Sequence, residues 1–212
     1  MGKVNIISSG SRGNAVLYGD NRILVDCGVS YAKIKSYCQQ ISIVLLTHTH
    51  GDHISLTTLR QLQFEHLSVR IGCCEWMLPL LQGLNNIDVY EIGKVYNYGV
   101  FKVSPFKLYH DVENCGYRIY LDDCKIFHAT DTAHLEGITA KGYDVYAIEA
   151  NYDEEKVEEA MRIAAERGEF CHAYGSVQSH LSWQSARRFF EYNKKDNKRV
   201  NGGNNINVGS KK

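Results

Sequence analysis

The sequence contains no apolar run of the roughly 20 residues that a membrane-spanning helix requires. Its amino terminus, MGKVNIISSGSRGN, also lacks the long apolar stretch and small-residue cleavage site of a secretory signal. With 44% hydrophobic and 23% charged residues, the composition is that of an ordinary soluble globular protein. We therefore expect a soluble, cytoplasmic protein that does not act at a membrane.

The sequence also lacks a charge imbalance and any C-x-x-C pair. Lys and Arg together number 24, as do Asp and Glu, so no global field attracts a polyanion. Any affinity for nucleic acid must therefore come from a local patch. The seven cysteines are odd in number and scattered, and we expect them to be reduced, mostly buried thiols.

Short β-rich segments alternate with longer helical patterns along the chain. The β-rich segments cover residues 22–26, 43–47, 69–73, 100–108, 116–121, 125–129 and 145–150. This alternation is typical of the α/β class, here with mixed sheets.

Apolar residues recur at helical spacing over 153–168, and again from Ser182 to about Asn193. Gly168 is a typical stop for the first helix, and the Ser182 hydroxyl is a typical amino-terminal cap for the second. Both helices are therefore predicted with defined ends.

The length of 212 residues is compatible with one domain, which we expect over 1–193. Residues 194–212 are rich in Lys, Gly and Asn and contain almost nothing apolar. We expect this stretch to be a basic, disordered tail.

The segment 42–47 is almost continuously apolar, as expected for a strand covered on both faces, and it leads into a histidine-rich loop. That loop places His48, His50, Asp52 and His53 within six residues. Imidazole and carboxylate groups bind zinc, manganese or iron, and four so close together can be divided between two adjacent ions. A polar surface loop would explain one such histidine but not this cluster, and the absence of cysteine favours a catalytic site over a structural one.

Three later residues are further candidates. His110 follows the run 100–108 much as the first cluster follows its strand, so it is a candidate third histidine ligand. Asp131 follows the run 125–129, where a carboxylate can bridge two metal ions. His180 lies just before the second helix and is a candidate last ligand or phosphate-contacting donor.

Other polar positions have weaker patterns. Asp26 closes an apolar strand and can either accept a hydrogen bond from a metal-binding histidine or form a turn. The segment 8–14 is rich in glycine and serine, so its backbone amides can approach an anion, although hairpin turns have the same composition. The remaining histidines receive no role: His66, His128, His134 and His172.

Together these motifs resemble a known family. Residues 47–53 are similar to the H-x-H-x-D-H signature of the metallo-β-lactamase superfamily, with His110, Asp131 and His180 in its later motifs. More narrowly, the chain resembles the YycJ-type (WalJ) exonuclease branch over about residues 3–192, in the segments 8–14, 24–28, 115–118, 130–132, 149–152 and 180–182. The resemblance implies an αββα sandwich of two mixed β-sheets flanked by helices, with two divalent metal ions, zinc or manganese.

The resemblance also assigns seven metal ligands to the two ions: His48, His50 and His110 on one, Asp52 and His53 on the other, Asp131 between them, and His180 completing the second site. One departure concerns Ser179-His180-Leu181-Ser182-Trp183, since the branch has asparagine at the last of these positions and a further His-Leu-Ser later in the chain. His180 therefore either completes the second site or contacts phosphate.

The function that follows is a metal-dependent phosphodiesterase. We expect a nuclease that hydrolyses DNA phosphodiester bonds with a hydroxide activated by two metal ions, while Asp52 or His180 relays a proton to the leaving oxygen. Candidate substrate-binding residues are Ser11, Asn14 and Ser182. Backbone phosphates are expected to contact the basic tail and four arginines: Arg12, Arg118, Arg187 and Arg188.

Several alternatives use the same metal centre. RNA or a small cyclic nucleotide can replace DNA as the phosphodiester, and neutral net charge favours the cyclic nucleotide. An ester, thioester or lactam hydrolase would direct the same chemistry at carbon. A scaffold protein that has lost its chemistry is a further class, which the intact histidine-rich loop makes less favourable.

Overall fold

The computed structural model describes residues 4–169, 177–194 and 205–210. The chain divides into two compact units, which we describe separately. The first unit comprises Met1–Phe106 and Leu121–Asp123, and the second comprises Lys107–Tyr120 and Cys124–Lys212.

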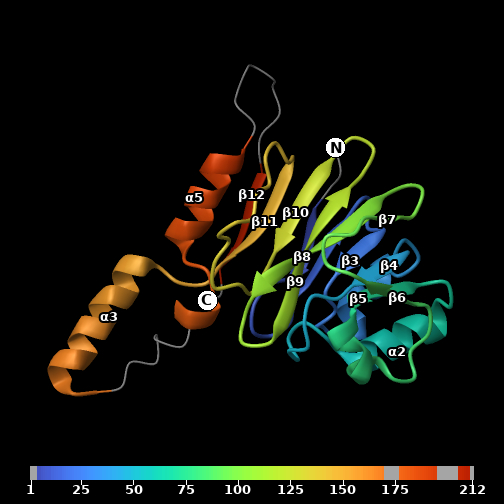
Figure 1. The fold of residues 1–212 in the computed structure, drawn as a ribbon. Helices are drawn as coiled ribbons and strands as arrows, with labels where there is room; N and C mark the ends of the chain where they lie inside the picture. Colours follow the sequence, from blue (N-terminus) through green and yellow to red (C-terminus); the bar gives the residue numbers. More distant parts are fainter. Residues whose placement is uncertain (1–3, 170–176, 195–204, 211–212) are drawn as a thin grey trace. The chain divides into compact units, whose positions relative to one another are not determined.

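The first unit is built on a six-stranded sheet whose strands follow their order in the sequence (Figure 1). These strands are β1 (Asn5–Ser8), β2 (Ala15–Tyr18), β3 (Ile23–Val25), β4 (Ile43–Leu45), β5 (Arg70–Cys74) and β6 (Ile87–Tyr90). The first three are antiparallel neighbours, whereas β3 to β6 run parallel. Parallel neighbours need crossover connections, and helices supply them.

The crossovers contain two α-helices, α1 (Tyr31–Ile34) and α2 (Leu56–Glu65), and two 3-10 helices, η1 (Lys35–Tyr37) and η2 (Glu75–Leu81). Their apolar side chains share one core with the sheet: Leu59 and Leu62 of α2 cluster with Leu24, Val44 and Ile71 of the strands. Every residue of β4 is buried, as the continuous apolar run predicts.

The second sheet has the strand order β12-β11-β10-β9-β8-β7. Its strands are β7 (Tyr96–Asn97), β8 (Lys102–Tyr109), β9 (Glu113–Tyr120), β10 (Lys125–Ala129), β11 (Val145–Ala150) and β12 (Asn205–Ser210). β9 and β10 form an antiparallel pair, and β11 lies parallel to both β10 and β12. This mixture of directions confirms the predicted mixed sheets.

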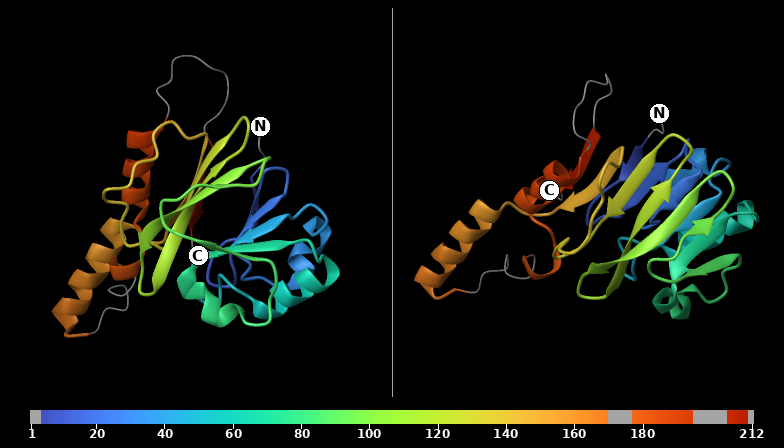
Figure 2. Two further views of the ribbon diagram at one scale, coloured as in Figure 1. Left: turned by 45° about the vertical axis from the view of Figure 1, so that its right-hand side comes forward. Right: turned by 45° about the horizontal axis from the view of Figure 1, so that its top comes forward.

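Two helices of the second unit differ in how they pack. α5 (Trp183–Asn193) lies against β11 and buries Ala186 and Phe190 (Figure 2). α3 (Glu154–Arg167) projects away from the strands of this unit and has no buried residue. The carboxyl end of α3 and the amino end of α5 are as predicted, since Gly168 follows α3 with a φ of 68° and the Ser182 hydroxyl accepts from the Ser185 amide at 3.0 Å. The amino-terminal cap of α3 is Asp153.

Part of the predicted tail differs from the expectation. Asn205–Ser210 forms β12, with Ile206 opposite Tyr146 and Val208 opposite Ile148 of β11. Composition alone predicts disorder here, but pairing with β11 supplies backbone hydrogen bonds that composition does not reveal. Residues 195–204 and 211–212 lie outside the described part of the chain.

Six cysteines of the described residues are free, and all six are buried: Cys27, Cys38, Cys73, Cys74, Cys115 and Cys124. This agrees with the predicted reduced thiols, while Cys171 lies outside the described ranges. In the part of the chain that the structure describes, no helix combines the length and the hydropathy that a membrane crossing demands. The prediction of a single domain stays a prediction.

Candidate functional site

The histidine-rich loop begins beyond strand β4, at the carboxyl edge of the first sheet. β3 and β4 are parallel, with Val25 opposite Leu45, so the residues that follow each strand emerge side by side. Asp26 follows β3, and its amide donates to the Leu45 carbonyl at 2.9 Å. The register of the sheet therefore places Asp26 beside the start of the loop.

Asp26 is the hydrogen-bond acceptor around which this loop is arranged. Its Oδ1 accepts from the Thr47 amide at 3.0 Å, and its Oδ2 accepts from Nδ1 of His53 at 2.6 Å. The Thr47 hydroxyl lies 2.9 and 3.0 Å from the two oxygens. The predicted hydrogen bond between Asp26 and a histidine is thus present, and it places the His53 proton on Nδ1.

Asn14 holds the far end of the loop. Its amide donates to the Asp52 carbonyl at 2.6 Å, and its side-chain Nδ2 lies 2.8 Å from Nε2 of His53 and 3.3 Å from Oδ2 of Asp52. The Gly10 amide in turn donates to Asn14 Oδ1 at 2.8 Å. Asn14 therefore orients two predicted ligands, while Ser11 is exposed in the preceding turn. Substrate contact by Asn14 and Ser11 stays a prediction.

The close approach of the loop to the backbone requires glycine at position 28. A Cβ on Gly28 would lie 1.8 Å from the Asp52 carbonyl oxygen and 2.8 Å from the His53 amide nitrogen. The Gly28 amide also donates to the Asn14 carbonyl at 3.0 Å. Backbone contacts on both sides thus fix the position of Asp52 and His53.

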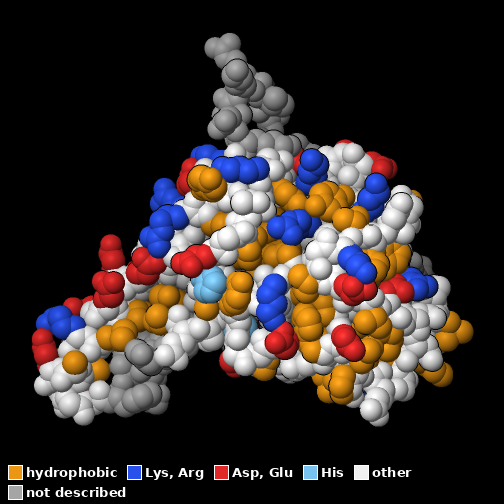
Figure 3. All heavy atoms as spheres, viewed as in Figure 1, with side chains coloured by type: hydrophobic (Ala, Val, Ile, Leu, Met, Phe, Trp, Pro, Cys, Tyr) orange, Lys and Arg blue, Asp and Glu red, His pale blue; other side chains and the backbone are white. Residues whose placement is uncertain are grey.

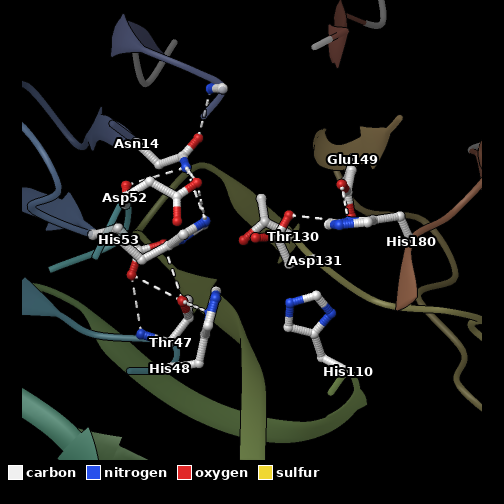
Figure 4. Close-up of polar contacts among 12 residues, drawn as sticks. Asn14, Thr47, His48, Asp52, His53, His110, Thr130, Asp131, Glu149 and His180 are labelled. Carbon is white, nitrogen blue, oxygen red and sulfur yellow. Dashed lines mark hydrogen bonds and ion pairs between the residues drawn. The ribbon is translucent and has the colours of Figure 1, made fainter. Parts of the chain in front are cut away.

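The imidazoles of the loop gather together, as Figure 4 shows for His48 and His53. The His48 ring centroid lies 4.8 Å from that of His50 and 4.2 Å from that of His53. Because His53 carries its proton on Nδ1, its Nε2 has the lone pair that a metal ion needs. This donor set of three imidazoles and the Asp52 carboxylate fits zinc or manganese by its chemistry.

The second unit contains a separate cluster at the end of β10. Asp131 has a φ of 51°, in the left-handed region, and its backbone carbonyl accepts from Nδ2 of Asn114 at 2.5 Å. The same Nδ2 donates to the Thr130 carbonyl at 3.0 Å. Asn114 on β9 therefore holds the turn that presents the Asp131 carboxylate.

His180 lies between two buried carboxylates in this cluster. Its Nδ1 is 2.6 Å from Oε1 of Glu149 and 3.5 Å from Oδ1 of Asp131 (Figure 4). Burial lowers the pKa of His180, but its hydrogen bonds with Asp131 and Glu149 outweigh burial and raise that pKa to about 9. Burial raises the pKa of Glu149 to about 7. Asp131, Glu149 and His180 each offer one potential ligand atom, and these three atoms lie within 4.8 Å of one another. Such a group also fits a divalent ion.

His110 lies close to this cluster, with its ring centroid 5.0 Å from that of His180. Its Nδ1 donates to the Ser179 carbonyl at 2.8 Å, and its Nε2 is 3.0 Å from Oδ1 of Asp111. Burial lowers the pKa of His110, which favours the neutral imidazole. The second unit thus brings together its three predicted ligands, His110, Asp131 and His180.

Glu149 is the residue of this cluster that the sequence did not single out. It is the penultimate residue of β11 and only 5% exposed, and its Oε2 accepts from the Thr132 amide at 3.2 Å. The sequence does contain one signal for it, because a carboxylate in an otherwise apolar strand is rarely buried without a partner or a function. Ser182, by contrast, is 1% exposed and caps α5 while donating to Glu154, so its predicted substrate contact stays a prediction.

Residues 21–196 match the protein family described as the beta-lactamase superfamily domain. The chain belongs to the beta-lactamase superfamily. Among curated proteins, exodeoxyribonuclease WalJ of Streptococcus pneumoniae is 29% identical over 172 residues, covering 72% of this chain and 64% of WalJ. The chain thus spans less than two thirds of the length of that relative.

Solved structures show the same fold. YhfI of Bacillus subtilis, a metallo-β-lactamase fold protein, has a TM-score of 0.63 at 19% identity, and the match covers 97% of this chain and 94% of YhfI. The short form of human tRNase Z has a TM-score of 0.67 at 16% identity, covering 91% and 88% respectively. These likenesses confirm the predicted metallo-β-lactamase fold. The superfamily and the fold are those of metal-dependent hydrolases, the class that the sequence predicts.

Proposed function

We propose that this protein is a metal-dependent phosphodiesterase that hydrolyses nucleic acid, with DNA as its preferred substrate. The observation that carries the proposal is the orientation of the candidate ligands. His53 and His110 each donate through Nδ1 to a carboxylate or carbonyl oxygen, which is how proteins orient metal-binding imidazoles. The likeness to exodeoxyribonuclease WalJ supports DNA as the substrate class.

In this proposal the chain binds two divalent ions, zinc or manganese, through six ligands expected from the sequence: His48, His50, Asp52, His53, His110 and Asp131. His180, the seventh expected ligand, either binds an ion as a neutral imidazole or, when protonated, contacts the substrate instead. Each of the two units supplies a set whose donor chemistry fits such ions. When bound, divalent ions polarise the phosphoryl oxygens and lower the pKa of water.

The catalytic acid in this proposal is His180. Glu149, at 2.6 Å from its Nδ1, orients the ring and favours the protonated imidazole at neutral pH. A protonated imidazole can donate its proton to the leaving oxygen of the phosphodiester. Asp52, which Asn14 contacts, is the alternative donor that we proposed from the sequence.

Phosphate contacts come from basic side chains in this proposal. The face shown in Figure 3 has Lys and Arg interspersed with Asp and Glu, with basic side chains over α5. Arg187 and Arg188 lie exposed on this helix, although Arg188 also pairs with Glu154 at 3.0 Å. Such contacts supply affinity without sequence preference and weaken as salt increases.

We also propose the cytoplasm as the site of action. The free, buried cysteines of the described residues suit a reducing compartment.

A panel of substrates tests the proposed function. We expect the purified protein with added manganese or zinc to cleave labelled single-stranded or duplex DNA. Cleavage of RNA in preference to DNA would change the substrate class, and turnover of cyclic nucleotides alone would support a small-molecule phosphodiesterase. Hydrolysis of esters, thioesters or lactams with no phosphodiester cleavage would overturn the proposal.

A further inference from the structure

Two aromatic rings of the second unit, from residues that are close in sequence to candidate ligands, are stacked on each other. Tyr109 is the last residue of β8, and its ring centroid lies 4.2 Å from that of His134, with an angle of 22° between the ring planes. Tyr109 is 44% exposed, so the stacked pair is accessible from solvent. The pair therefore presents a flat aromatic surface.

Hydrogen bonds fix the backbone that bears both rings. The Tyr109 amide donates to the Thr132 hydroxyl at 3.1 Å, and that hydroxyl donates to the His134 carbonyl at 2.9 Å. The Ala133 amide donates to the Tyr109 carbonyl at 2.6 Å. One threonine thus links the strand end to the loop that bears His134. A surface ordered in advance loses less conformational entropy when a ligand binds.

The imidazole of His134 has no other visible function. Its Nδ1 is buried and has no hydrogen-bond partner among the residues that the structure describes. Nor does His134 belong to a candidate metal group in that part of the chain. Its position is therefore explained by stacking on Tyr109 and by the backbone bonds of the loop.

The location of the pair connects it with the proposed chemistry. Tyr109 directly precedes His110, and His134 follows Asp131 by three residues. Consecutive Cα atoms are about 3.8 Å apart, so the Cα atoms of Tyr109 and His134 lie within about 4 and 11 Å of those of these two proposed ligands. In a nucleic acid strand, each phosphate has a base only one sugar away.

We propose that Tyr109 and His134 form a stacking platform for the nucleobase next to the scissile phosphodiester. This inference rests on the proposed function and adds the form of the substrate, a single strand whose terminal base is unpaired and free to stack. Every base has an aromatic face, so the platform gives affinity without sequence preference. Such a platform would also make the protein bind nucleotide substrates in preference to phosphodiesters that carry no base.

Binding affinity tests the platform independently of turnover. The probes are a labelled short oligothymidylate and a matched abasic strand with the same sugar and phosphate groups, measured by fluorescence anisotropy. The wild-type protein should bind the base-bearing strand about tenfold more tightly. Tyr109→Ala should abolish that preference, whereas Tyr109→Phe and His134→Phe should keep it because they retain an aromatic ring.

Tyr192→Ala is the matched control, since Tyr192 is another exposed tyrosine of the same unit and lies on α5. It should keep the preference for bases, and thermal unfolding should show that each variant folds. Equal affinity of the wild type for both strands, binding of neither, or a preference that survives Tyr109→Ala would overturn the platform. Platform-dependent binding without any cleavage would support this inference while contradicting the proposed hydrolysis.

Discussion

At the scale of single residues, two aspartates of the candidate site share an uncommon backbone conformation. Asp26 follows β3 with a φ of 59°, and Asp131 follows β10 with a φ of 51°. Non-glycine residues rarely adopt this region, and the strain persists only where surrounding contacts enforce it. Asp26 gains hydrogen bonds from Thr47 and His53, which offset the strain and orient the loop.

Asp26→Asn should weaken metal binding without removing a proposed ligand. Asparagine lacks the charge that holds the His53 proton on Nδ1, so the ring loses its fixed orientation. Changes of this kind typically reduce metal affinity about 10- to 100-fold. Competition with a chromophoric chelator measures the affinity. The exposed Asp122→Asn is the control, and an Asp26→Asn affinity equal to that control would contradict the assigned role.

The pair of His180 and Glu149 predicts how the stability of the metal-free protein depends on pH. The folded-state pKa of His180 is raised from 6.5 to about 9, so the folded protein binds the proton more tightly than the unfolded chain does. The resulting stability is fully present below about pH 6.5 and is lost as pH rises through 9. We expect the Tm of the chelator-treated protein to fall over this range.

Glu149→Gln should make that fall smaller, because it removes the carboxylate 2.6 Å from His180 Nδ1. Glu158→Gln, an exposed position on α3, serves as the control for a lost carboxylate. If the Tm of both variants depended on pH as steeply as that of the wild type, Glu149 would not be the partner that retains the His180 proton.

At the scale of elements, the predicted and the missed segments differ in how far apart in the sequence their interacting residues lie. β4 was predictable because a buried strand requires a continuous apolar run, and α5 because its cap and apolar stripe are local. α2 was missed because it buries the polar side chains of Thr58 and Gln63, which interrupt the apolar pattern. Their partners, such as the Val29 carbonyl, lie far away in the sequence.

In the candidate site, too, the local patterns were predictable and the contacts between distant residues were not. The histidine-rich loop is contiguous, so its residue types reveal it directly. Glu149 contacts His180 across 31 positions of the sequence (180 minus 149), and Asn14 contacts His53 across 39. No local pattern encodes such pairs, because the register of the sheet and the loop geometry bring them together.

A pair of glycines tests how tightly the loop is fixed. Gly28→Ala would place a Cβ 1.8 Å from the Asp52 carbonyl, so the backbone must shift, and we expect a loss of about 3 kcal/mol in the free energy of unfolding. Gly51→Ala has nothing within 4 Å of its added Cβ and should change stability by less than about 0.5 kcal/mol. Urea denaturation measures the free energy of unfolding of both variants and of the wild type. Equal losses would show that the approach of Gly28 to the loop is not tight.

At the scale of the whole molecule, superfamily membership and fold agree with the chemistry of the candidate ligands. Formal net charge is zero, so binding of a polyanion depends on local contacts rather than on a global field. The proposed function therefore rests on the metal ligands and on a limited set of phosphate and base contacts. Metal dependence is the property on which the proposed hydrolysis depends.

The most direct test of this claim is hydrolysis of single-stranded DNA by chelator-treated protein before and after manganese or zinc is restored. We predict no cleavage without metal, recovery on its return, loss of activity in His48→Ala and full activity in the control His66→Ala. Cleavage that persists without metal, or that survives in His48→Ala at the wild-type rate, would contradict a metal-dependent phosphodiesterase centred on the histidine-rich loop.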